Sequence, residues 1–214
     1  MSTDAKTEIL ARIRGALGDA PAAPEVERTY RRASDRARAE VVDMLEDRLV
    51  DYKATVHRET PESLPARIAA LLGASSRYVV PEGLDRSWLP EETGMRRAIV
   101  DPNDSRAASA LGVRELNAVD AVITSSTVSC AETGTIFLTG RADEGRRAIS
   151  LVPDHHICVV TLDSVVDLVP EALARVEPTA PVTMISGPSA TSDIELERVE
   201  GVHGPRRLDV VLLG

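Results

Sequence analysis

Two short segments of the sequence concentrate the side chains that could bind a ligand or catalyse a reaction. The first begins at residues 124–127, Thr-Ser-Ser-Thr at the end of an apolar run, and continues to Glu132 in a short connection. A carboxylate there could act as a general base, as a covalent nucleophile or as an acceptor for a substrate hydroxyl. It could equally cap exposed backbone amides, with Gly134 providing the positive φ of a turn. The spacing supports these interpretations about equally.

The second segment, residues 185–195, combines a strand end, a glycine turn and a helix start. Ser192 and Glu195 have the spacing of a capping box. The amides of the turn and its four hydroxyl side chains could hold a phosphate or a carboxylate. Asp193 and Glu195 complicate that assignment, because carboxylates in the first turn compete with an anion and could instead hold a cation. A plainly capped helix and a ligand-binding turn are therefore equally supported.

Parallel strands would bring these segments together. If strands at 119–124 and 182–185 are parallel, both segments lie at carboxyl ends, the edge where open α/β sheets bind ligands. His203 reaches this edge if the strand at 208–213 runs antiparallel to its neighbour, and it could then exchange protons near neutral pH. A surface histidine in a turn is the simpler interpretation of His203. His155 and His156 are expected at the opposite edge, pointing to opposite faces, which makes a poor shared metal site.

The candidate catalytic residues are therefore Glu132 and His203. The candidate ligand-binding residues come from the two segments and from the glycine after His203: Ser125, Ser126, Thr133, Gly134, Thr135, Ser186, Gly187, Pro188, Ser189, Thr191, Ser192, Asp193, Glu195 and Gly204. A metal ion could bind near Asp193, Glu195 and His203, but their spacing is not diagnostic, so we predict no metal site. His57 has no functional neighbours in the pattern.

The elements that must position these residues follow an alternating pattern from about residue 55. Strands rich in Val and Ile are expected at 77–80, 96–100, 119–124, 135–139, 156–161, 182–185 and 208–213. Helices are expected after residue 60, over 104–111 and after Pro170. This alternation predicts an α/β fold with a mostly parallel sheet and helices on both faces. The closely spaced strands within 119–139 could add an antiparallel pair.

The first 55 residues are expected to form an N-terminal helical extension. Ile9, Leu10, Ile13 and Leu17 share one helical stripe, and a Pro/Ala-rich linker follows at 19–24. A second helix is expected over 34–53. We therefore divide the chain into a helical extension at 1–55 and an α/β domain at 56–214. The amphipathic extension makes a homo-oligomer plausible.

Composition narrows the class of protein. Thirty-four acidic against twenty-five basic residues give the 214-residue chain a net charge of −9, which disfavours nucleic-acid binding. Two cysteines cannot by themselves ligate an iron–sulfur cluster. The sequence shows no signal peptide and no apolar run long enough to span a membrane, so a cytoplasmic protein is expected. The usual dinucleotide, NTP, zinc-protease and serine-hydrolase motifs are absent.

Four sequence blocks together resemble one known family. They are Ala-Glu-Thr-Gly-Thr at 131–135, Pro-Asp-His-His-Ile at 153–157, the segment at 186–195 and Gly-Val-His-Gly-Pro at 201–205. In this order and spacing they resemble the lactate utilization protein C family of the LUD domain superfamily. The helix start at 7–13 is similar as well, so the resemblance covers nearly the whole chain and is most specific over 119–214.

The resemblance implies a fold of the NagB/RpiA/CoA-transferase type and a role in oxidising L-lactate to pyruvate beside two iron–sulfur partner proteins. With two cysteines, this chain resembles the cluster-free component and is expected to bind no cofactor itself. Two hypotheses follow. In the first, the chain binds a small carboxylate ligand or organises its partner subunits. In the second, it is a stand-alone enzyme that binds a sugar phosphate or acyl group and uses Glu132 as nucleophile or base.

Overall fold

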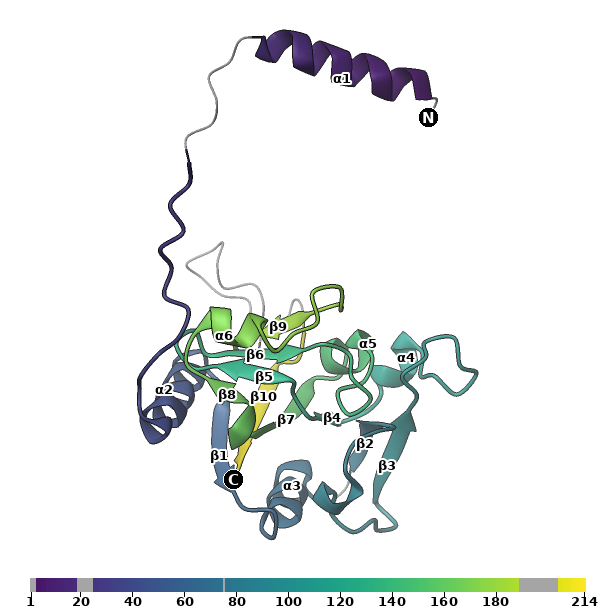
Figure 1. Cartoon of the computed structure of the whole chain (residues 1–214). Coiled ribbons are helices and arrows are strands. Elements are labelled where there is room, and N and C mark those ends of the chain that lie inside the picture. The colour runs from purple at the N-terminus through teal and green to yellow at the C-terminus, as the bar shows by residue number, and fades with distance from the viewer. Residues whose placement is uncertain (1–2, 19–24, 75, 189–203) are drawn as a thin grey trace. The chain divides into compact units, whose positions relative to one another are not determined.

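The computed structural model describes residues 3–18, 25–74, 76–188 and 204–214, and it divides the chain into two compact units, Met1–Tyr30 and Arg31–Gly214 (Figure 1). The first unit contains helix α1, Thr3–Leu17. Gly18, with φ of 43°, ends the helix by donating its backbone N–H to the carbonyl of Arg14. The apolar stripe expected from the sequence is present on α1, and its side chains are exposed.

Helix α2, Arg38–Asp51, belongs to the second unit. Its apolar positions lie one, three and four residues apart, so they form one face of the helix. All four are buried: Val41, Val42, Leu45 and Leu49. The structure thus places α2 in the core of the larger unit, whereas the sequence assigned it to an extension ending at residue 55.

The central sheet of the second unit has six parallel strands in the order β1-β10-β7-β4-β2-β3. Their bounds are Thr55–Glu59 for β1, Ser76–Pro81 for β2, Arg96–Asp101 for β3, Ala121–Thr124 for β4, His155–Thr161 for β7 and Arg207–Leu213 for β10. This confirms the predicted α/β fold. The sequence missed β1, because an edge strand reading Thr-Val-His-Arg-Glu lacks the apolar run of a central strand.

A second sheet of four strands, in the order β8-β5-β6-β9, packs against the first. Its strands are β5 (Val128–Cys130), β6 (Thr135–Leu138), β8 (Val165–Val166) and β9 (Thr183–Ile185). The expected antiparallel pair is present as β5 and β6. Strand β9 pairs antiparallel with β6.

Two expectations about strand pairing are therefore wrong. Strand β9 is not a parallel neighbour of β4, because it lies in the other sheet. Strand β10 is parallel to both its neighbours rather than antiparallel. All its residues except Arg207 are buried, and apart from Arg207 and Asp209 they are apolar, as expected for a central strand covered on both faces.

The two faces of the central sheet are covered differently. Even-numbered residues of β7 and β10, such as Cys158 and Val210, face the second sheet and α2. Odd-numbered residues, such as Val159 and Val211, pack against α3, which spans Leu64–Leu72 (Figure 1). Alternate residues of a strand point to opposite faces, which accounts for this division.

Short helices complete the covering layers. Helices α4 (Val113–Leu116) and α5 (Arg147–Leu151) cover the β2–β4 end of the sheet, and α6 (Val169–Leu173) covers the outer face of the second sheet. The chain also forms the 3-10 turns η1 (Arg86–Trp88) and η2 (Leu162–Ser164). The helix expected over 104–111 is not formed. Asp104 instead accepts from the backbone N–H of Arg106, and this local bond competes with helix formation.

Candidate functional site

The structure joins parts of the two predicted segments in a hydroxyl cluster formed by Thr133, Thr135 and Ser186. Thr135 Oγ1 lies 2.8 Å from Thr133 Oγ1 and 2.9 Å from Ser186 Oγ. The antiparallel pairing of β6 with β9 places Ile136 opposite Ile185, which brings the residues beside them together. The segments thus meet through the second sheet and not through a shared edge of parallel strands. Hydroxyls that rotate freely can either donate to or accept from a ligand.

Two glycines allow this cluster to pack closely against the C-terminal half of α2. A Cβ on Gly134, whose φ is 59°, would lie 2.7 Å from Arg48 Cβ. A Cβ on Gly187, whose φ is 113°, would lie 2.6 Å from the carbonyl oxygen of Tyr52. Only glycine allows both the backbone conformation and the close approach at these positions.

Glu132 lies beside the cluster and forms an ion pair with Arg31. Arg31 Nη2 donates to Glu132 Oε1 at 2.5 Å, and both side chains are partly exposed. This hydrogen bond, together with the charge of Glu132, raises the pKa of Arg31. Glu132 also donates its backbone N–H to the carbonyl of Asp167. To act as a base or nucleophile, the Glu132 carboxylate would first have to separate from Arg31.

The other described candidates have different surroundings. Ser125 is buried and bonds through its backbone N–H and its hydroxyl to Asp143, away from the hydroxyl cluster in the hydrogen-bond network. Ser126 Oγ is buried without a partner among the described residues. Gly204 lies close to Pro188, because a Cβ on Gly204 would be 3.8 Å from the carbonyl oxygen of Pro188.

The remaining predicted site residues lie outside the described part of the chain. They are Ser189, Thr191, Ser192, Asp193, Glu195 and His203.

A histidine–aspartate cluster on the central sheet was missed by the sequence analysis. Asp209 on β10 is fully buried and accepts from His57 Nε2 at 2.8 Å, His155 Nε2 at 2.7 Å and Arg207 Nε at 2.7 Å. The register aligns Thr55 with Asp209 and Arg207 with His155, so all four side chains share one face. Because His57 and Asp209 are 152 residues apart, no local pattern could have paired them.

This cluster fixes the ionisation of its carboxylate. Burial by itself raises the pKa of Asp209, but hydrogen bonds from His155, His57 and Arg207 outweigh it and hold the pKa at about 2. The charged carboxylate orients both imidazoles through Nε2, an arrangement that can support proton transfer at the other ring nitrogen.

His156 points to the opposite face, as expected for the neighbour of His155 on a strand. Its Nε2 lies 2.8 Å from Thr124 Oγ1, and its Nδ1 is buried without a partner among the described residues. Burial, together with the charge of His155, lowers the pKa of His156 to about 3. The ring is therefore neutral, and its position is structural.

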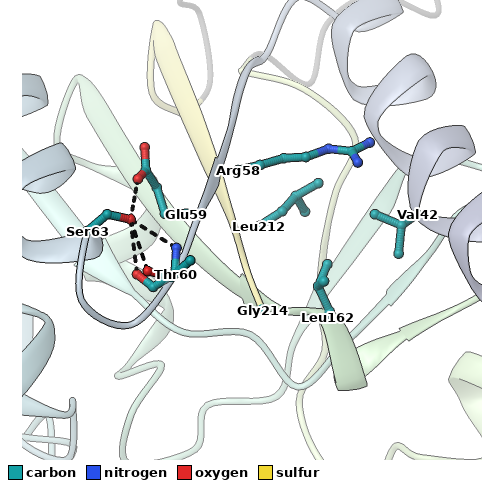
Figure 2. Close-up of a pocket in the computed structure, with 8 residues that line it drawn as sticks. All are labelled: Val42, Arg58, Glu59, Thr60, Ser63, Leu162, Leu212 and Gly214. Atoms are coloured by element: carbon teal, nitrogen blue, oxygen red, sulfur yellow. Dashed lines mark hydrogen bonds between the residues drawn. The ribbon is translucent and has the colours of Figure 1, made fainter.

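The carboxyl edge of the central sheet holds a cavity of about 270 Å³ between β1, β10 and α2 (Figure 2). Figure 2 shows Arg58 extended toward α2 and Glu59 turned toward Ser63. Arg58 bonds to Asp43 and Glu46, and Glu59 accepts from Ser63 Oγ and Arg67 Nε. Hydrogen bonding from Ser63, followed by Arg67, lowers the pKa of Glu59. Both charged groups of this cavity thus have partners within the protein.

Within residues 3–18, 25–74, 76–188 and 204–214, no three His, Cys, Asp or Glu side chains are grouped so that they could hold a metal ion. None of the described helices combines the length and apolar character needed to cross a membrane.

Comparisons with known proteins place the chain in a family. Residues 27–213 match the LUD domain. Lactate utilization protein C of Deinococcus radiodurans is 44% identical over 217 residues, covering 100% of this chain and 97% of that protein. The protein of the same name from Geobacillus thermodenitrificans is 31% identical over 76% of this chain and 72% of its own length.

A solved structure supports the same family assignment. The crystal structure of a DUF162 family protein from Deinococcus radiodurans at 1.70 Å resolution superposes with a TM-score of 0.68 and 41% identity, covering 84% of this chain and 99% of that one. The match covers most of the chain. The chain belongs to the LUD domain family.

Proposed function

We propose that this protein acts in L-lactate oxidation to pyruvate, as a cytoplasmic component without a redox centre of its own that works with iron–sulfur partner subunits. The observation that carries the proposal is the 44% identity to a lactate utilization protein C over essentially the full length of both chains. Identity at that level over the whole length favours a shared role, which fold alone would not.

The cysteines support a component that leaves electron transfer to others. Cys130 and Cys158 are both free and completely buried. Burial raises the pKa of the Cys158 thiol to about 12. Iron–sulfur clusters are held by several thiolates, so a pair of enclosed cysteines is a poor ligand set. The electrons released from lactate must then pass to a partner.

The chain's own contribution is to bind a small carboxylate or to organise the partner subunits. The partly exposed hydroxyls of Thr133 and Ser186 support ligand binding at this part of the second sheet. The alternative of a stand-alone enzyme with Glu132 as nucleophile is less favoured, because Arg31 already occupies that carboxylate.

The experiment is to tag the protein in its own host, purify it gently and assay lactate-dependent dye reduction with and without co-purifying proteins. We expect activity only when iron–sulfur partners are present, and loss of lactate oxidation when the gene is deleted. A partnerless protein, with lactate oxidation intact in the deletion strain, would refute the proposal.

A further inference from the structure

A second cavity, of about 210 Å³, lies between the chain leading into α2 and the β8–α6 segment. We name it the arginine pocket, after three of its lining residues. It is lined by Ser34, Arg36, Arg38, Val41, Val165, Val166, Asp167, Glu171 and Arg175. Because Glu132 donates its backbone N–H to Asp167, the pocket adjoins the Glu132 turn.

Asp167 is the unusual group of this pocket. Its side chain is 4% exposed, and its Oδ1 has one described partner, Arg36 Nη1, at 3.3 Å. Its Oδ2 is enclosed without any hydrogen-bond partner in the described part of the chain. A buried carboxylate oxygen without a partner is costly, so a donor supplied by a ligand would stabilise it.

Three arginines supply positive charge to the lining of the pocket: Arg36, Arg38 and Arg175. Arg38 is anchored, because it donates to the carbonyl oxygens of Leu162 and Val165. Arg36 uses Nη1 to contact both Asp167 Oδ1 and Met44 Sδ, and Arg175 uses Nη1 to donate to the carbonyl of Asp163. Among the described residues, their Nη2 and Nε atoms have no partner, and such a planar group suits a carboxylate.

The remaining lining residues define the size and polarity of the ligand. Three arginines against Asp167 and Glu171 leave one positive charge in excess, which a monocarboxylate would balance. Glu171 is already committed, because its Oε2 accepts from the backbone N–H of Leu168 at 2.8 Å. Three buried valines form an apolar wall suited to a short alkyl group: Val41, Val165 and Val166.

We infer that the arginine pocket binds a small 2-hydroxycarboxylate, with the carboxylate on Arg36 and Arg175, the hydroxyl donating to Asp167 and the alkyl group against the valines. This inference rests on the proposed function and names L-lactate as the first ligand to test. The carboxyl-edge cavity of Figure 2 is a weaker candidate, because its charged groups are already paired.

The test is calorimetric titration of the full-length protein with L-lactate, propionate, pyruvate and L-alanine. Propionate lacks the hydroxyl that would donate to Asp167, and pyruvate has a carbonyl acceptor in its place. We expect L-lactate to bind roughly tenfold more tightly than either, as for the loss of a hydrogen bond to a charged group. Tighter binding of L-alanine than of L-lactate would overturn the inference in favour of an amino-acid site.

Variants separate the parts of the pocket. Arg36→Gln is expected to weaken L-lactate and propionate alike by about tenfold or more, because both carry the carboxylate. Asp167→Ala is expected to weaken L-lactate selectively, so that its affinity approaches that of propionate. If the Asp167 variant fails to fold, Arg175→Gln is the alternative, because Arg175 is more exposed than Asp167. Arg58→Gln, which removes a partly exposed arginine from the other cavity, is the matched control and should leave binding unchanged.

The outcomes also distinguish the pocket from the proposed function. Absence of L-lactate binding, or loss of binding in Ser186→Ala but not in Arg36→Gln, would overturn the pocket and leave the lactate role standing. In another outcome, L-lactate binding depends on Arg36, but deletion of the gene leaves lactate oxidation unchanged. That outcome would support the pocket and refute the role in oxidation.

Discussion

A buried neutral histidine makes the stability of this protein depend on pH. The pKa of His156 is about 3 in the folded protein, whereas an unfolded histidine titrates near 6.5. As pH falls below 6.5 the unfolded chain takes up a proton that the folded chain does not, so stability decreases until pH reaches about 3. Between pH 7 and pH 5 this residue should cost roughly 2 kcal/mol of unfolding free energy, measurable by urea titration.

The matched comparison is His156→Gln, which keeps a polar side chain near Thr124 but cannot take up the proton. Its stability difference between pH 7 and pH 5 should be smaller than that of the wild-type protein by the same roughly 2 kcal/mol. Equal pH dependence in the two proteins would show that the ring is accessible to protons in the folded state.

Asp209 should act in a separate and more acidic range. Its pKa of about 2 lies below that of an unfolded aspartate, so its stabilising effect is complete above pH 4 and is lost as pH falls toward 2. Asp209→Asn should lower the unfolding free energy at pH 7 by about 3 kcal/mol, because it leaves His57, His155 and Arg207 without their charged partner. Arg207→Gln should cost less, since that side chain is half exposed. A smaller loss in Asp209→Asn than in Arg207→Gln would contradict this assignment.

Among the elements, α2 depends on the glycine that follows β9. An alanine at Gly187 would place its Cβ 2.6 Å from the carbonyl oxygen of Tyr52 and force a backbone conformation that side chains rarely adopt. We expect Gly187→Ala to destabilise the protein by roughly 2 kcal/mol in urea unfolding. Gly94→Ala is the control, because no atom lies within 4 Å of its added Cβ and its φ lies outside the positive range that side chains rarely adopt. Equal stability of the two variants would mean that α2 can shift without cost.

The elements could be predicted well where the signal is local. Val- and Ile-rich runs identified the central strands, and Pro170 lies in the first turn of α6, as expected. Partners between distant strands could not be predicted. The polar strand β1 has no apolar run, and nothing near residues 183–185 indicates that they join a second sheet instead of the first.

The same limit applies to the candidate sites. The hydroxyl-rich segments were identified from their composition, and the structure brings Thr135 and Ser186 within hydrogen-bonding distance. The His57–Asp209–His155 cluster and the arginine pocket each join residues more than 50 positions apart. To predict these two sites, one must know the order of the strands and the course of the chain, and local sequence patterns do not give either.

At the scale of the whole molecule, α1 presents an apolar stripe that its own unit leaves exposed. Ile9, Leu10, Ile13 and Leu17 are each between 38% and 59% exposed. Such a stripe favours pairing with a second copy of the helix. We expect the full-length protein to sediment as an oligomer, and the double variant Ile9→Ser/Ile13→Ser to sediment as a smaller species with an unchanged urea midpoint. The same mass for both proteins would exclude α1 as the interface.

The position of β10 between β1 and β7 has a consequence for biosynthesis. Among the described strands β1 pairs with β10 alone, and β10 is the last of them to be translated. During translation, β1 is therefore synthesised early, and its pairing strand β10 is synthesised only near the end of the described chain. Its polar sequence, Thr-Val-His-Arg-Glu, suits that delay, because charged edge strands resist pairing with other nascent chains. The pairing of β10 with β1 joins β1 to the sheet and brings Asp209 to His57, so the same pairing also completes the buried charge network.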